Sequence, residues 1–306
     1  MSLSLIALPG AEACADRLAT KLEAALCRLE HRRFADGEQY LRVADDVQGR
    51  DVVVVAQLRN PDPQLPALLF LADALRELGA RGVGLVAPYL PYMRQDARFR
   101  PGEAVTSRSV AKWISSSFDW LATVDPHLHR FPTLDALYKL PSAAVPSAAA
   151  VALWIHGHVS HPCIVGPDEE SEQWVAQVAN LARCPYTVLG KRRLSDRQVE
   201  LRLPDLAPLR GHTPVLVDDI IASAHTMAEA VGRLRAAGLP PAVCVGVHAV
   251  FAGDAADLLR RSGAARVVTC NTLAHPSNAI DVSEALAEAV RMLRFEHPSQ
   301  GVRIMA

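Results

Sequence analysis

The sequence predicts an α/β protein of two tandem domains, each with a mainly parallel sheet flanked by helices. Short runs of β-branched residues alternate with helix-period segments along the whole chain, a pattern typical of parallel α/β folds. The apolar runs show no polar alternation, as expected of strands that are covered on both faces. The length of 306 residues suits two domains of ordinary size, each with its own core.

Seven runs are predicted to be strands: residues 52–55, 83–87, 121–124, 163–165, 215–217, 243–247 and 267–269. Residues 131–150 are rich in Pro, Ala and Ser and suit a linker between two α/β units. We therefore expect an N-terminal domain over residues 1–145 and a C-terminal domain over residues 146–306, with the last helix packing back on the first domain.

The two halves read as degenerate copies of one unit. Residues 49–57 align with residues 211–219, and a strand, loop, helix, glycine and strand occur in both halves. In this alignment Ala56 and Gln57 occupy the places of Asp218 and Asp219, so only the second half carries the carboxylates. The alternative interpretation is that α/β proteins repeat this unit without a duplication.

The composition argues against a nucleic-acid-binding protein, a membrane protein and a disulfide-stabilised protein. The formal net charge is −1 with about a fifth of the residues charged, so we expect no nucleic-acid partner. No stretch approaches the roughly 20 apolar residues of a membrane span, and the first residues lack a basic targeting region, so we expect a cytoplasmic protein without a membrane partner. The six cysteines show no close pairs and are expected to be buried, reduced side chains: Cys14, Cys27, Cys163, Cys184, Cys244 and Cys270.

The segment 215–227 combines the features of a sugar-phosphate site. Apolar residues lead into Asp218 and Asp219 and then into a short loop and a helix. Such a junction gathers free backbone N–H groups at the positive end of a helix dipole, which favours a phosphate. The hydroxyls of Ser223 and Thr226 can donate to phosphate oxygens, while the aspartates can accept hydrogen bonds from two sugar hydroxyls. The alternative is an ordinary strand end followed by a capped helix.

This segment resembles the motif with which type I phosphoribosyltransferases and ribose-phosphate pyrophosphokinases bind phosphoribosyl pyrophosphate (PRPP). The family usually has a glycine just before the loop threonine, where this chain has Ala224 and His225. A position that needs positive φ would be strained at such residues. The resemblance implies that these residues bind ribose 5-phosphate: Asp218, Asp219, Ser223, Ala224, His225 and Thr226.

Three segments of the first half resemble elements that distinguish the pyrophosphokinases from single-domain transferases. Residues 88–96 (PYLPYMRQD) resemble the Pro-Tyr and Arg-Gln-Asp signature, residues 34–38 the Phe-x-Asp-Gly-Glu element, and residues 121–129 a strand ending in Asp-x-His. Arginine suits ATP because its planar fork binds phosphate oxygens in pairs. The resemblance implies these ATP-binding residues: Phe34, Asp36, Glu38, Arg94, Gln95, Asp96 and His127.

The resemblance also implies an assembly and a metal. In the family the 34–38 element approaches the adenine from a neighbouring subunit, so we expect a homodimer or a larger homo-oligomer. Mg²⁺ is the implied cofactor, with His127 and Asp168 as its protein contacts. His127 and His129 alternatively suggest zinc, but no third or fourth ligand lies nearby in the sequence. Glu169 and Glu170 stand where related synthases continue with glycines, and we assign them no role.

Residues 188–193 (VLGKRR) resemble the flexible catalytic loop of the same family, in which a lysine and an arginine two residues later close over the transferring phosphates. The resemblance makes Lys191 and Arg193 the catalytic residues, whereas a charge run by itself indicates only a solvated face. The implied reaction transfers the pyrophosphoryl group of ATP to ribose 5-phosphate, giving PRPP and AMP. Two alternatives stay open: a non-catalytic regulatory subunit, and an enzyme that uses the same pocket for another phosphorylated sugar.

Overall fold

The protein is represented by a computed structural model that describes residues 2–128, 130–167, 171–195, 198–202, 206 and 209–296. Residues 191–195, 198–202, 295 and 296 are described by their backbone alone. Packing divides the chain into two compact units. Unit 1 comprises Met1–Val145, Thr272–Ala274 and the segment that begins at Ser283, and unit 2 comprises Pro146–Asn271 and His275–Val282.

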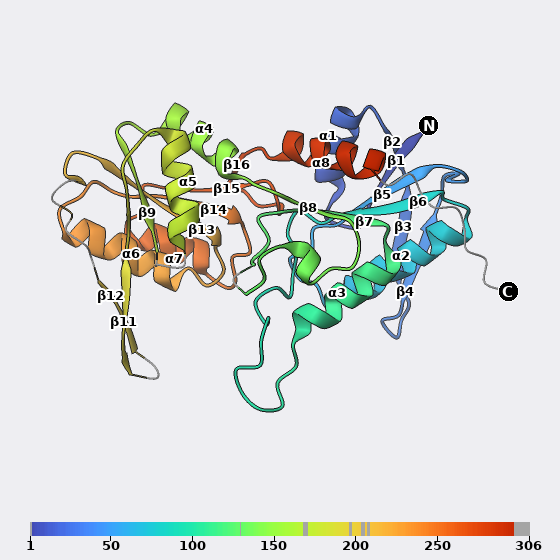
Figure 1. Ribbon diagram of the computed structural model, residues 1–306, viewed down its shortest axis with the longest axis horizontal. Coiled ribbons are helices and arrows are strands. Elements are labelled where there is room, and N and C mark those ends of the chain that lie inside the picture. Colours follow the sequence, from blue (N-terminus) through green and yellow to red (C-terminus); the bar gives the residue numbers. More distant parts are fainter. Residues whose placement is uncertain are drawn as a thin grey trace. The chain divides into compact units, whose positions relative to one another are not determined.

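Unit 1 is built on a six-stranded parallel sheet with the order β2-β1-β5-β6-β7-β8 (Figure 1). Helices α1 and α8 pack together on one face of this sheet, and α2 and α3 pack together on the other. The strands are β1 (Leu3–Ala7), β2 (Ala25–Cys27), β5 (Asp51–Val55), β6 (Gly82–Val86), β7 (Trp120–Val124) and β8 (Ser142–Val145). The helices are α1 (Glu12–Leu22), α2 (Leu65–Glu77), α3 (Thr106–Ser117) and α8 (Ser283–Glu296), with a 3-10 turn at Leu134–Ala136.

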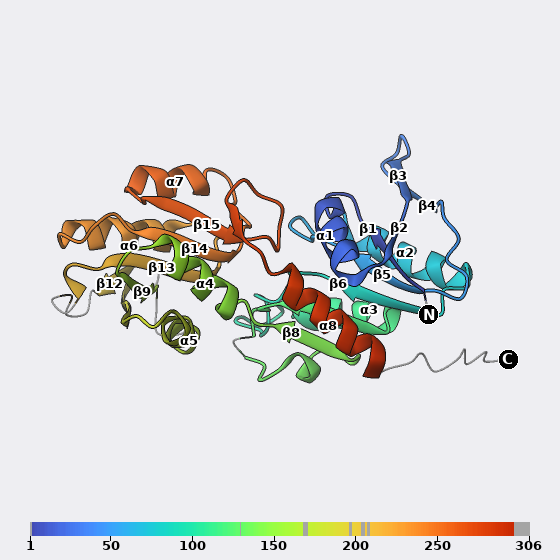
Figure 2. The same cartoon turned by 90° about the horizontal axis from the view of Figure 1, so that it is seen from above.

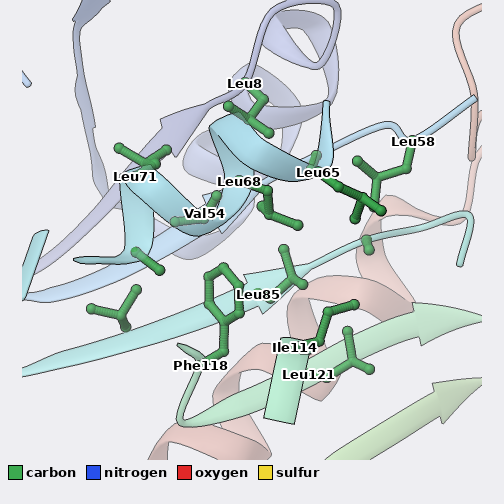
Figure 3. Close-up of a cluster of buried hydrophobic side chains, with 14 of the residues drawn as sticks. Leu8, Val54, Leu58, Leu65, Leu68, Leu71, Leu85, Ile114, Phe118 and Leu121 are labelled. Carbon is green, nitrogen blue, oxygen red and sulfur yellow. The ribbon is translucent and has the colours of Figure 1, made fainter. Parts of the chain in front are cut away.

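The core of unit 1 follows from the helical spacing of apolar residues in α2. Leu65, Leu68 and Leu71 lie on one face of this helix and point toward the sheet (Figure 3). There they meet buried side chains of the central strands, including Val54 and Leu85. A residue buried in this way contributes roughly 1.5–3 kcal/mol relative to leaving it in water. The core therefore fixes α2 over the strands whose carboxyl ends carry the candidate residues.

Unit 2 repeats this arrangement with the strand order β10-β9-β13-β14-β15-β16, all parallel. Helices α4 and α5 pack together on one face, and α6 and α7 on the other (Figures 1 and 2). The strands are β9 (Pro162–Gly166), β10 (Tyr186–Val188), β13 (Thr213–Ile220), β14 (Val243–His248), β15 (Arg266–Cys270) and β16 (Asn278–Ile280). The helices are α4 (Ala148–His158), α5 (Glu172–Ala182), α6 (His225–Ala236) and α7 (Ala255–Ser262).

The two units share one strand order, which confirms the prediction of two tandem domains with mainly parallel sheets. In each unit the strands of the main sheet, counted along the chain, follow the order 2-1-3-4-5-6. Each unit also has a two-stranded antiparallel hairpin after its second strand: β3 (Leu29–Arg33) with β4 (Gln39–Val43), and β11 (Gly190–Ser195) with β12 (Gln198–Arg202). Figure 1 shows the β11–β12 hairpin extending away from the sheet of unit 2, and Figure 2 shows β3–β4 extending away from the sheet of unit 1.

The segment 131–150, expected to be a linker, instead contains regular structure. It contributes the 3-10 turn Leu134–Ala136, the edge strand β8 and the start of α4. Strand β8 consists of Ser142, two alanines and Val145, residues of small size that lack the β-branched run by which the other strands were recognised. Pairing with β7 and the burial of Tyr138, rather than local propensity, stabilise this segment.

None of the described helices is both long and apolar enough to cross a membrane.

Candidate active site

Two adjacent carboxylates lie at the carboxyl end of β13 in unit 2. Asp218 pairs with Gly246 of β14, and both Asp218 and Asp219 are half-buried. The Asp218 carboxylate accepts a hydrogen bond of 3.0 Å from the backbone N–H of Asp219. Ligands of open parallel sheets bind outside the carboxyl ends of the strands, so this position suits contacts with a substrate.

The loop after β13 turns directly into helix α6. Ala224 is the N-cap of α6 and adopts the left-handed conformation, with φ 60° and ψ 6°. For a residue other than glycine this conformation costs roughly 1–2 kcal/mol. No side chain caps this helix end, and the first amides of a helix have no intrahelical acceptors. The predicted strain at Ala224 is therefore present, and it opens a helix end suited to an anion.

The polar residues of this loop lie at different places around the helix end. Ser223 and Thr226 are exposed. The side chain of His225 lines a surface cavity of about 420 Å³ beside α7, together with Glu229 and Arg261. Arg261 donates a hydrogen bond to Asp254 and, with a smaller effect of His225, holds the pKa of that carboxyl below its usual range. His225 therefore lies between the loop and this surface cavity, which is lined by charged residues.

The predicted catalytic residues lie on the hairpin of unit 2 rather than on an irregular loop. Lys191 and Arg193 belong to β11, where they pair with Leu201 and Val199 of β12. Their side chains lie outside the described part of the chain. Asp168, the predicted metal contact, and its neighbours Glu169 and Glu170 also lie outside the described residues.

The Arg-Gln-Asp triplet of unit 1 lies in the long connection between β6 and α3. Arg94 is exposed, Gln95 is half-buried, and its carbonyl accepts a 3.4 Å hydrogen bond from the N–H of Ser107 in α3. The preceding Tyr92 has a left-handed backbone, with φ 61°, and its hydroxyl donates to Asp62. Backbone strain of this kind persists where the surroundings over-determine it and is frequent at functional sites.

Asp96 borders a basic cavity in unit 1. Its side chain is buried and lies 3.3 Å from Nε of Arg130. The cavity has a volume of about 350 Å³, and its lining includes Asp96 together with Arg98, Arg108 and Arg130. Three arginines and one aspartate among the lining residues leave an excess of positive charge, which favours phosphate oxygens. Arg108 and Arg130 come from separate segments that meet Asp96 only on folding, so no local sequence pattern indicates their role.

The Phe34 element forms the turn of the β3–β4 hairpin. The N–H of Phe34 donates to the carbonyl of Glu38 at 2.8 Å, and Asp36 accepts from the N–H of Glu38 at 3.1 Å. The Phe34 ring is 45% exposed and lies beneath the guanidinium of Arg32, with 4.6 Å from Cζ to the ring centroid. This hairpin turn presents an aromatic ring and two carboxylates at the surface, as a contact with an adenine requires.

His127 follows β7 in the loop that lies beside the Arg-Gln-Asp connection. The N–H of Val124, at the end of β7, donates to the carbonyl of Pro88 at 3.1 Å, which joins the two strand ends. His127 is half-buried. Among the described residues no group of three or more His, Cys, Asp or Glu side chains could hold a metal ion.

The candidate residues fall into two sets, one in each unit. In unit 2 the six predicted ribose-phosphate residues all lie within residues 218–226, around the end of β13 and the start of α6. In unit 1 the triplet 94–96 and His127 lie on neighbouring strand ends, whereas Phe34, Asp36 and Glu38 lie on the separate β3–β4 hairpin.

Comparison with known proteins gives a consistent result over the whole chain. The family described as the N-terminal domain of ribose phosphate pyrophosphokinase matches residues 3–117, and the phosphoribosyl transferase domain family matches residues 136–286. The ribose-phosphate pyrophosphokinase of Methanopyrus kandleri is 36% identical over 279 residues, covering 90% of this chain and 94% of that protein. The enzyme of the same name from Methanosarcina acetivorans is 34% identical over 294 residues, covering 95% and 100%. A crystal structure of phosphoribosylpyrophosphate synthetase from Mycobacterium smegmatis superposes with a TM-score of 0.84 at 26% identity, covering 97% of this chain and 99% of that chain.

Proposed function

The chain belongs to the ribose-phosphate pyrophosphokinase family, which makes PRPP, and we propose that it carries out this reaction with the residues described above. Its substrates are ATP and ribose 5-phosphate, and its products are PRPP and AMP. The observation that carries the proposed site is the order of features in unit 2: two carboxylates end β13, and a loop closed by the left-handed Ala224 opens α6.

Ribose 5-phosphate would bind at this end of β13. Asp218 and Asp219 would accept hydrogen bonds from the two ribose hydroxyls. The amides at the start of α6 would donate to the 5-phosphate, with the hydroxyls of Ser223 and Thr226 as further donors. Ala224 would contribute its backbone, and His225 would add a ring N–H donor beside the phosphate.

ATP would bind to unit 1. Arg94 would contact the phosphates, and Gln95 and Asp96 would help to seat the nucleotide. The arginines of the neighbouring cavity, Arg108 and Arg130, would add positive charge for the phosphates. Phe34 would cover one face of an adenine, and the carboxylates of Asp36 and Glu38 suit its exocyclic amine. By the family resemblance this last contact would be made to the nucleotide of a neighbouring subunit.

Transfer of a pyrophosphoryl group asks the protein mainly to align the reactants and to neutralise charge. The anomeric hydroxyl of ribose 5-phosphate would attack the β-phosphorus, the bond to the α-phosphate oxygen would break, and AMP would leave. Lys191 and Arg193 would stabilise the negative charge that builds on the transferred group. None of the described residues is assigned as the base that takes the hydroxyl proton.

The reaction requires a metal ion, and we propose Mg²⁺. This ion prefers oxygen ligands and binds through one or two carboxylates together with substrate phosphates. The carboxylate of Asp168 fits that mode. His127 offers a ring nitrogen instead and is proposed as a contact on the nucleotide side of the ion by the family resemblance. Bound Mg²⁺ would neutralise charge on the phosphate oxygens.

We further propose a cytoplasmic homodimer or larger homo-oligomer. The six cysteines all lie in the described part of the chain and form no disulfides with one another, as expected in a reducing compartment. The exposed Phe34 turn would complete a neighbouring subunit's adenine site. Size-exclusion chromatography with light scattering tests the assembly, and a monomer at micromolar concentration would contradict it.

AMP formation from ATP tests the function. The assay compares reactions with and without ribose 5-phosphate and with and without Mg²⁺, and adds ribose 1-phosphate and glucose 6-phosphate as other acceptors. AMP that forms only with ribose 5-phosphate and metal supports the proposal. Nucleotide binding by folded protein without AMP formation would indicate a regulatory subunit, and AMP formed preferentially with another sugar phosphate would indicate the second alternative.

A further inference from the structure

A short segment, residues 248–252, which we call the strap, is hydrogen-bonded to the loop between β13 and α6. The N–H of Ile221 donates to the carbonyl of His248 at 3.1 Å. In return Phe251 donates from its N–H to the carbonyl of Ile221 at 2.8 Å, and Ala252 donates to the carbonyl of Ala222 at 3.0 Å. Three backbone hydrogen bonds therefore tie this strap to the first two residues of the loop.

The side chain of Ile221 locks the same contact from the sheet. Ile221 is buried, and a Cβ atom on Gly246 would lie only 2.6 Å from its terminal carbons. Position 246 of β14 must therefore be glycine to leave room for the Ile221 side chain. The start of the loop is thus fixed both by hydrogen bonds and by packing.

Phe251 is the unusual residue of the strap. Its backbone lies in the left-handed region, with φ 37°, which a residue with a side chain rarely adopts. Its buried ring stacks on the imidazole of His275, with 4.4 Å between ring centroids and 23° between the planes. Such a conformation persists only where the surroundings hold it, and here the stacked ring and the hydrogen bond from the N–H of Phe251 to Ile221 both hold it.

The imidazole of His275 is itself fixed from β15 and β16. Its Nδ1 lies 2.7 Å from Oγ of Ser277, which lies 2.8 Å from Oγ1 of Thr269 in β15. The N–H of His275 donates to Oδ1 of Asn278 at 3.1 Å, and the Asn278 amide donates to Thr269 and to the Cys270 carbonyl. The ring beneath Phe251 therefore rests on a hydrogen-bonded network that belongs to the sheet.

We propose that Phe251, seated on His275, is a positioning residue for the 5-phosphate of the sugar substrate. The stack of the two rings holds residues 248–252 in place, and their N–H groups in turn hold the carbonyls of Ile221 and Ala222. The loop then enters α6 through the strained Ala224, so the amides at the start of α6 are already aligned for the phosphate. This inference rests on the proposed binding of ribose 5-phosphate to the loop. A loop that must reorder on binding would lose affinity for the phosphate, because ordering costs free energy at that step.

The test substitutes Phe251 in the full-length protein and measures steady-state kinetics for each substrate separately. We expect Phe251→Leu to raise KM for ribose 5-phosphate on the order of 10- to 100-fold, the range that a displaced substrate contact produces. KM for ATP should change less than threefold. Phe251→Tyr keeps a ring of the same shape over His275 and should restore most of the lost affinity.

Trp154→Leu is the matched control. Trp154 stacks on His158 at 4.7 Å between centroids, in the same unit but on α4, so its loss removes the same kind of contact away from the loop. Circular dichroism first establishes that each variant is folded. If Phe251→Leu is unfolded, His275→Ala, which removes the other ring of the stack, carries the same expectation.

Two outcomes would overturn the inference: a KM for ribose 5-phosphate that rises no more in Phe251→Leu than in Trp154→Leu, or equal rises in KM for both substrates. Wild-type protein that forms no AMP would overturn the proposed function instead. The two failures are therefore distinguishable.

Discussion

The side chain of Gln57 accepts a hydrogen bond of 3.0 Å from the backbone N–H of Ala274, more than two hundred residues later in the chain. Both residues belong to unit 1. Gln57 follows β5 in the place that Asp219 takes at the end of β13, so the two copies of the fold use equivalent positions differently. In unit 2 the position carries a candidate substrate carboxylate, and in unit 1 a buried amide anchors a distant segment.

Gln57→Leu should lower the free energy of unfolding by roughly 0.5–1.5 kcal/mol, because it removes the hydrogen bond that the buried Gln57 side chain accepts from the N–H of Ala274. Urea denaturation measures the loss. Gln173→Leu, at an exposed position of α5, is the control and should change stability little. Equal stability of the two variants would show that the Gln57 contact does not anchor the segment.

Ala224→Gly should raise the free energy of unfolding by about 1 kcal/mol, since glycine adopts φ 60° without the clash that alanine suffers. Ala228→Gly, within the same helix, should lower it by a similar amount because glycine is a poor residue in a helix interior. Thermal denaturation of both variants checks the opposite signs. A destabilised Ala224→Gly protein would mean that Ala224 is not strained in solution.

Lys191→Ala and Arg193→Ala should each reduce kcat by on the order of 10²–10³, the loss typical of a preorganised charge that stabilises a transition state. AMP release at saturating ATP and ribose 5-phosphate gives kcat. Lys139→Ala removes an exposed lysine of unit 1 and serves as the control. If kcat is unchanged in both hairpin variants, Lys191 and Arg193 are not catalytic residues.

Asp51 should link the stability of unit 1 to pH. Burial by itself would raise the pKa of its carboxyl, but hydrogen bonds from Arg81 and from Arg294 of α8 lower it further than burial raises it. Because the pKa of Asp51 is lower in the folded than in the unfolded state, the carboxylate stabilises the fold at any pH above its unfolded pKa of roughly 3.9. This stabilisation is lost as the pH falls through the folded-state pKa. Asp51→Asn should therefore destabilise the protein at neutral pH, and the difference from wild type should shrink below about pH 4.

Asp257→Asn provides the comparison for this titration. Asp257 pairs with Arg260 on the exposed surface of α7, where an ion pair contributes roughly 0–1 kcal/mol. Urea denaturation between neutral and acid pH should show a pH-dependent loss for Asp51→Asn alone. A loss that is constant with pH would contradict the linkage.

The sequence predicted those parts of the fold that rest on local pattern. The seven expected strands are all present because each is a short run rich in apolar and β-branched residues, whereas strands β1, β2, β10 and β16 were not expected. Strand β8 was missed because its alanines have little β propensity and its pairing with β7 is a tertiary effect. The segment with the proposed catalytic residues was expected to be a loop, but pairing of β11 with β12, such as that of Arg193 with Val199, makes it a hairpin.

Site residues were predictable where they form one continuous motif, and the rest depended on folding. Asp218 and Asp219 could be proposed from the sequence because they end an apolar strand before a small-residue loop. Arg130 and Arg108 could not be proposed from the sequence, since each reaches the Asp96 cavity from a different segment. The stack of Phe251 on His275 joins residues from two loops, and no local pattern in either loop indicates it.

The fate of the three phosphorus atoms of ATP tests the central claim most directly. ATP labelled separately at the α, β or γ phosphorus is incubated with the protein, ribose 5-phosphate and Mg²⁺, and the products are separated by ion exchange. Transfer of an intact pyrophosphoryl group predicts that the β and γ labels both appear in the sugar product while the α label appears in AMP. A sugar product that carries the γ label alone, or folded protein that forms neither AMP nor a labelled sugar, would contradict the account.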